Sequence, residues 1–185
     1  MKNPWIRRRH VRGLVVLLML TSVVACAAPA SSATQAAPTS YEEYRVAACS
    51  AWDALFRAVG NPDTGTGSDL SRALDQAVAA RDPASADRLA VEIENELAAG
   101  RGHVAIAGGW LPRADAMIQL DRVFVAFEAM TDAKRQAARG EPNAVDPQAA
   151  LEAAGGIDAW FALMEAMRAS TGVTDQPCPN VPVTP

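Results

Sequence analysis

The sequence has few of the residues from which catalytic and metal sites are usually built. It contains only two histidines, His10 and His103, and three cysteines with no Cys-x-x-Cys pair. It has no Gly-x-Ser-x-Gly turn, no EF-hand loop and no Glu-x-x-His pair, the patterns of serine hydrolases, calcium loops and di-iron bundles. We therefore expect no catalytic residue, no metal and no cofactor, and a protein that is not an enzyme.

The chain also lacks an apolar run long enough to span a membrane. Its main part, after residue 25, lacks an excess of basic charge. The uncharged run at residues 14–24 has eleven residues, whereas a permanent membrane span needs about 20. Five of the 17 basic residues lie in residues 1–25, which hold no acid, so the remainder carries 12 basic against 21 acidic residues and a net charge of −9. Because like charge repels phosphate, we expect no nucleic-acid partner.

The first 26 residues carry the parts of an export signal. A basic segment at residues 1–13 precedes the short apolar run, which ends in Val23-Val24-Ala25-Cys26. This pattern resembles the lipobox of bacterial lipoproteins. The resemblance is confined to residues 1–26 and implies cleavage before Cys26, palmitate-type acylation of its thiol, and anchoring to membrane lipid at the extracytoplasmic face of a bacterial membrane.

Two other signals stay open for the same segment. An ordinary secretory signal, cut after an Ala-x-Ala-like site, would leave Cys26 unmodified. Residues 7–9 are three arginines, which suggest a twin-arginine signal, but their surroundings match that pattern poorly.

The rest of the chain divides by composition. Residues 26–40 form the anchor and a flexible tether of Ala, Ser, Pro and Thr, too poor in large apolar groups to fold. Residues 41–172 carry helical periodicity almost throughout, and residues 173–185 form an extended tail with four prolines. We predict an all-α fold, an antiparallel bundle of four to five helices in residues 41–172.

Caps and glycines mark the predicted helices. Ser40, Ser68, Asp82-Pro83 and Asp146-Pro147 begin four of them, and another begins at Trp110-Leu111-Pro112. Gly60, Gly140 and Gly172 end the first, fourth and fifth. Gly155-Gly156 is expected to kink the fifth helix, and whether the third continues past Gly100 stays open.

The cysteines suggest one bridge. With Cys26 acylated, Cys49 and Cys178 remain as a pair in an oxidising compartment, so we predict a disulfide that fixes the tail to the first helix. The alternative is two thiols with a redox or metal role. No histidine lies near either cysteine in sequence, which favours the disulfide.

Other candidate sites are weak. His103 lies between glycines and has no recognisable catalytic partner. The pairs Glu92/Glu96 and Glu128/Asp132 are spaced one helical turn apart, which suits either a cation site or a solvated acidic face. The glycine-rich segment 100–109 lacks the order of a phosphate loop, so close helix packing or a hinge is the better interpretation.

Large apolar residues suggest two kinds of binding. Trp160, Phe161, Met164 and Met167 have core spacing but would also line a ligand pocket between helices. Trp110 and Arg113 at a helix start would present a contact to a partner protein. Our first hypothesis is a lipid-anchored, non-catalytic helical module that binds a protein partner of unknown identity. The alternative is a carrier or sensor of a small hydrophobic ligand held inside the bundle.

Overall fold

The computed structural model describes residues 36–61, 65–169 and 178. The chain divides into two units, Met1–Thr34 and Gln35–Pro185, and all described residues belong to the second. The predicted signal segment and Cys26 therefore lie outside the described residues. Within the described part, no helix is both long enough and apolar enough to cross a bilayer.

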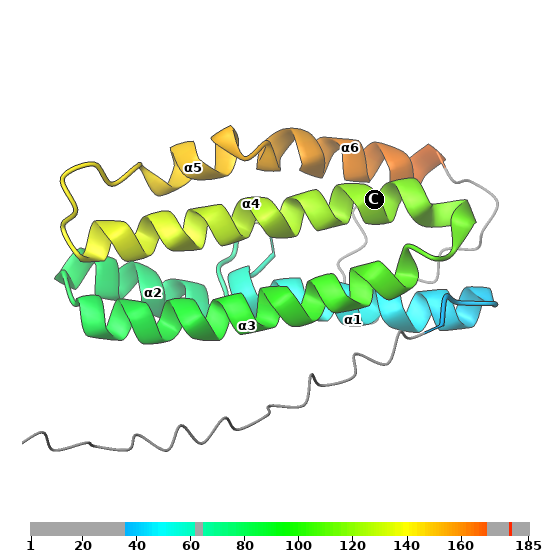
Figure 1. Cartoon of the computed structure of the whole chain (residues 1–185), viewed down its shortest axis with the longest axis horizontal. Coiled ribbons are helices and arrows are strands. Elements are labelled where there is room, and N and C mark those ends of the chain that lie inside the picture. The colour runs from blue at the N-terminus through cyan, green and yellow to red at the C-terminus, as the bar shows by residue number, and fades with distance from the viewer. Residues whose placement is uncertain (1–35, 62–64, 170–177, 179–185) are drawn as a thin grey trace, which may run out of the picture. The chain divides into compact units, whose positions relative to one another are not determined.

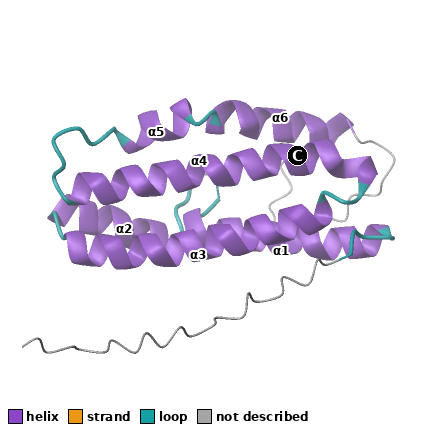
Figure 2. Ribbon diagram, viewed as in Figure 1, coloured by secondary structure: helices purple, strands orange, loops and turns teal. Residues whose placement is uncertain are grey.

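The described residues form six α-helices and one 3₁₀ turn, and they contain no β-strand, so the all-α prediction is confirmed. The elements are α1 (Tyr41–Val59), α2 (Asp69–Ala80), α3 (Pro83–Ala107), the turn η1 (Leu111–Arg113), α4 (Ala114–Ala138), α5 (Pro147–Ala153) and α6 (Gly156–Ala169). Figure 1 shows the long helices side by side, with α4 between α3 and the pair α5–α6. Figure 2 shows how short most connections are.

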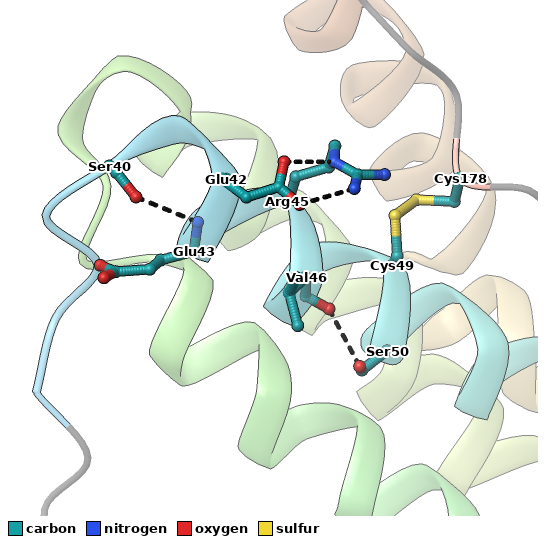
Figure 3. Close-up of polar contacts among 8 residues, drawn as sticks. All are labelled: Ser40, Glu42, Glu43, Arg45, Val46, Cys49, Ser50 and Cys178. Carbon is teal, nitrogen blue, oxygen red and sulfur yellow. Dashed lines mark hydrogen bonds and ion pairs between the residues drawn. A yellow bond between two sulfur atoms is a disulfide. The ribbon is translucent and has the colours of Figure 1, made fainter.

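Helix α1 begins where the sequence predicts. The Ser40 hydroxyl accepts a hydrogen bond from the Glu43 N–H at 3.3 Å (Figure 3). In a capping box the glutamate bonds back to the N-cap N–H, but the Glu43 carboxylate accepts from the N–H and hydroxyl of Thr39 instead, at 2.7 and 3.0 Å. These two bonds favour the charged form and hold the pKa of Glu43 below its usual value.

Helix α3 continues through its two glycines, which answers the question left open by the sequence. A Cβ placed on Gly100 would lie 2.4 Å from the ring of Phe124 and 3.1 Å from Cβ of Ala54. Gly100 therefore permits α1 and α4 to approach α3 closely, and the packing around Phe124, which is fully buried, offsets its low helix propensity. Gly102 faces open space.

The predicted fifth helix is two helices, so the described helices number six rather than four or five. Gly155 has φ +73°, a left-handed conformation that ends α5. Gly156 starts α6, and a Cβ there would lie 2.7 Å from Cβ of Ala126 on α4. A kinked continuous helix was expected at this pair, and the left-handed residue produces a complete break.

The core is built mainly of leucine, alanine and a few large side chains. Its largest fully buried members include Phe124, Leu55, Leu74, Ile93 and Leu97. Alanines on α1 and α3 let these helices pack closely, because small side chains shorten the distance between helix axes. The predicted disulfide is present between Cys49 of α1 and Cys178, with 5.3 Å between the Cα atoms (Figure 3).

Candidate functional site

A groove of about 590 Å³ opens on the described surface. Its wall on one side is the end of α1, residues 65–67 and the first two turns of α2. Its floor and other wall come from α4, the start of α5 and the first turns of α6. These elements meet because α4 packs against α2 on one side and against α5 and α6 on another.

The floor of the groove is apolar. Val123, Phe127 and Met130 come from one face of α4, where their spacing of four and three residues aligns them. Val123 is buried, whereas Phe127 and Met130 are half-buried. Phe127 and Met130 therefore leave apolar surface open to whatever occupies the groove.

Helix α6 supplies the aromatic wall. Trp160 and Phe161, two of the four residues of the predicted ligand pocket, line the groove, and Ile157 lies one turn before them. Phe161 is 67% exposed and Ile157 is 39% exposed. Two large apolar side chains are thus left in water at the mouth of an apolar groove, an arrangement typical of a binding surface.

Trp160 is held from behind by α1. Its ring meets the ring of Trp52 edge-on, with 5.8 Å between centroids and 86° between planes. Trp52 is buried and also contacts Phe56, at 5.8 Å between ring centroids. This support fixes the orientation of the aromatic wall before any ligand arrives.

The mouth carries one basic and one acidic residue, and both are already paired. Arg72 forms an ion pair with Asp69 and donates to the carbonyl of Gly67 at 2.8 Å. Asp75 pairs with Lys134 of α4 at 2.6 Å. The mouth therefore has no net charge from these two lining residues, which suits a ligand that is neutral over most of its length.

The polar side chains that line the groove are those of Asn61, Thr66, Ser71, Arg72, Asp75 and Gln148. No histidine or cysteine is present among the described residues that line it. His103 lies on α3, outside this lining. Gln148 at the mouth donates from its side-chain amide to Glu152 at 3.1 Å. A few polar groups around an apolar floor fix orientation and specificity in small-molecule sites.

The other residues of the predicted pocket lie elsewhere. Met164 is half-buried and packs against the core rather than lining the groove. The side chain of Met167 lies outside the described residues. Sequence reasoning missed Arg72, Asp75 and the segment 65–67, because only the packing of α2 against α4 brings them to α6.

The predicted partner contact is turned inward. Arg113 is only 2% exposed, and Trp110 is half-buried against the core. Leu111 between them is 84% exposed and was not singled out by the sequence. The turn thus presents a leucine where an arginine and a tryptophan were expected.

Three of the four acidic residues pair with arginine, and Asp132 accepts a hydrogen bond from the side-chain amide of Gln136 at 2.7 Å. Glu96 binds Arg57 of α1 at 2.9 Å, and Glu128 lies 3.4 Å from Arg101. Glu92 pairs with Arg88 on its own helix at 3.3 Å. Within the described ranges there is no group of three or more His, Cys, Asp or Glu residues that could hold a metal ion.

Comparison with protein-family models, with curated proteins and with solved structures finds no match to this chain.

Proposed function

We propose that this protein is an exported lipoprotein, held at the extracytoplasmic face of a bacterial membrane by acylated Cys26. Its antiparallel helical bundle then binds a small, mostly apolar molecule in the groove between α2, α4 and α6. The observation that carries the proposal is the groove of about 590 Å³ with Trp160 and Phe161 in its wall. The lipobox-like residues 23–26 support the anchor.

The size and lining of the groove fit a small molecule. Ligand sites commonly have volumes of about 300–1,000 Å³, with apolar and aromatic walls and few polar groups. Here α4 gives the apolar floor, α6 gives the aromatic wall, and Arg72, Asp75 and Gln148 stand at the mouth. We expect a ligand with an apolar body and a polar end that stays at this mouth.

The exposed apolar side chains of the α6 wall favour ligand binding, because a bound ligand would remove their surface from water. Covering a large apolar side chain contributes about 1.5–3 kcal/mol when burial is complete. Phe161 and Ile157 each have surface left to cover. The support of Trp52 behind Trp160 also reduces the ordering that the site must undergo, which favours affinity.

A protein partner is the second candidate for the same groove. Phe161 is two-thirds exposed at the mouth of the groove. Aromatic side chains commonly act as anchors at protein interfaces. In this form the domain is the non-catalytic interaction module of our first hypothesis, and apolar side chains of the partner fill the groove.

The proposal is tested with a neutral apolar dye, N-phenyl-1-naphthylamine, titrated into the purified full chain. We expect saturable fluorescence enhancement that weakens about tenfold in the variant Ile157→Asp. Val125→Asp on α4 is the matched control, because Val125 is also β-branched and also 39% exposed but does not line the groove. Equal dye affinity in wild type and Ile157→Asp would overturn the proposed site.

The protein released from its own membrane separates the two candidates. Native mass spectrometry is expected to show a stoichiometric small-molecule mass that is lost on denaturation and is absent from Ile157→Asp. A photoreactive phenylalanine analogue at position 161 that crosslinks to one polypeptide, with no small-molecule mass present, would favour the protein partner. The denatured spectrum also reports the acyl mass on Cys26.

A further inference from the structure

The turn between α3 and α4 presents an apolar tip. Leu111 is 84% exposed, the highest value among the large apolar side chains of the described residues, and Pro112 beside it is also exposed. A single exposed leucine is common on protein surfaces and carries no argument alone. The rigid backbone around Leu111 and its position in the domain are what support the inference. We call Leu111 and Pro112 the tip.

The turn is built so that Leu111 cannot fold inward. Trp110 on one side is half-buried against the core, and Arg113 on the other is 2% exposed. The Arg113 N–H donates to the carbonyl of Trp110 at 3.0 Å, and the Trp110 N–H donates to Ala107 at 3.0 Å. With both neighbours turned in and the backbone closed, Leu111 is left projecting.

The chain that comes from Cys26 reaches the domain at this same turn. Ala37 and Pro38 lie against Gly109, where an added Cβ would lie 2.6 Å from Cβ of Ala37. Ala37 follows Cys26 by eleven positions in the sequence, and eleven residues of any chain span at most about 40 Å. The tip therefore lies beside the point at which the chain from Cys26 enters the described domain.

A second hollow lies on the elements that flank the turn. A hollow of about 430 Å³ lies between the end of α3 and the start of α4, and Ile118 in its lining is 51% exposed. Ile118 lies just after the first turn of α4, which begins at Ala114 directly after η1. Exposed apolar side chains thus occur both in η1, at Leu111, and early in α4, at Ile118.

We infer that the tip is a second membrane contact, which inserts Leu111 into the interface of the same bilayer that holds the acyl chains of Cys26. The inference rests on the proposed lipid anchor. Once tethered, the tip meets the bilayer at a high effective concentration, so a contact too weak for a free domain becomes populated. Stable membrane association commonly combines an acyl chain with a second signal of this kind.

Charge around the tip indicates which lipids matter. Glu42 and Glu43 lie in the first turn of α1, close to Pro38, and Asp115 lies in the first turn of α4. These acids give no attraction to anionic headgroups, so the contact depends on apolar insertion. We expect it on zwitterionic phosphatidylcholine and expect little weakening by salt.

The contact also orients the groove. In Figure 1 the α3–α4 turn lies at the opposite end of the domain from α2 and the start of α5, which both contribute to the groove. A domain that stands on its tip holds the groove away from the bilayer surface. The ligand would then exchange with the aqueous compartment.

The cysteines of this chain make a direct test simple. In the acylated protein Cys26 is blocked and Cys49 is bonded to Cys178, so a Leu111→Cys variant has one free thiol for an environment-sensitive NBD dye. Val145→Cys is the matched control, because Val145 is 50% exposed and lies in the loop between α4 and α5. Both labelled proteins are reconstituted in phosphatidylcholine vesicles that contain a nitroxide-labelled lipid.

We expect the dye at position 111 to be quenched by the lipid nitroxide at least threefold more than the dye at 145. Aqueous iodide is expected to quench it less. Equal accessibility of both dyes to iodide, with Cys26 shown by mass to be acylated, would overturn the tip contact and leave the anchor in place. A mass without acyl groups would instead remove the anchor, and with it the basis for the tip.

Discussion

Trp52 and Trp160 meet edge-on, with ring centroids 5.8 Å apart, and join the core of α1 to the wall of the groove on α6. Trp52 follows Cys49 by three residues on the same helix, so the disulfide to Cys178 and the aromatic contact lie within one turn. The groove therefore depends on a buried residue that does not line it.

Replacing Trp52 should weaken both stability and dye binding. Trp52→Ala removes a buried aromatic, which commonly costs about 3–5 kcal/mol, and it leaves the ring of Trp160 without support. We expect N-phenyl-1-naphthylamine affinity to fall several-fold, and Trp52→Phe to retain most of it. Urea unfolding and dye titration measure the two effects.

A general loss of stability must be separated from loss of the wall. Ile93→Ala on α3 serves as the control, because Ile93 is 1% exposed and does not line the groove. It should lower the free energy of unfolding by about 2–5 kcal/mol with dye affinity unchanged. If Ile93→Ala and Trp52→Ala weaken dye binding equally, Trp52 has no specific part in the groove.

The disulfide should stabilise the domain strongly, because Cys49 and Cys178 are 129 residues apart in sequence. In the chain-entropy model a loop of this length is worth about 5 kcal/mol. The double variant Cys49→Ser, Cys178→Ser is expected to unfold at a much lower urea concentration than the oxidised wild type. Coincident unfolding curves for the two proteins would contradict this, and a thiol assay on the unreduced protein checks that the native bridge is complete.

Local signals predicted most of the helix starts. Ser68 and Asp82 each accept a hydrogen bond from the N–H three residues on, as their N-cap positions require. The first helix likewise starts beside Ser40. Such bonds involve residues close in sequence, so they can be inferred without knowledge of the tertiary structure.

Features set by distant residues escaped prediction. The sequence alone does not show whether α3 ends or continues at Gly100, because its continuation depends on packing against the ring of Phe124. It did not place Arg72 or Asp75 in the groove, because α2 and α6 are joined there only through packing on α4. It also assigned the partner contact to Arg113, which the fold of the turn buries.

The two glycines of α3 should respond in opposite directions to alanine. Gly100→Ala forces a methyl group against Phe124, and overpacking of this kind typically costs about 1–3 kcal/mol. Gly102→Ala meets nothing within 4 Å and should stabilise the helix by about 0.5–1 kcal/mol through lower chain entropy. Denaturant unfolding of both variants measures the pair.

A compensating change strengthens that comparison. Phe124→Leu in the Gly100→Ala background removes the ring atoms that clash, so part of the lost stability should return. If Gly100→Ala is as stable as Gly102→Ala, the close approach of α3 and α4 is not what requires glycine at position 100.

Acid should weaken the start of α3 through its N-cap. The Ser85 hydroxyl and N–H hydrogen-bond to the carboxylate of Asp82 and hold its pKa below the ordinary value of 3.8. A carboxyl whose pKa is lowered on folding stabilises the protein fully above its unfolded pKa. That contribution disappears as the pH falls below the ordinary value and through the lowered one.

The variant Asp82→Asn keeps a capping side chain that does not titrate. The difference in unfolding free energy between wild type and Asp82→Asn, measured by urea unfolding from pH 6 to pH 2, should therefore shrink or reverse at the acidic end, whereas parallel curves would show that Asp82 makes no charged cap.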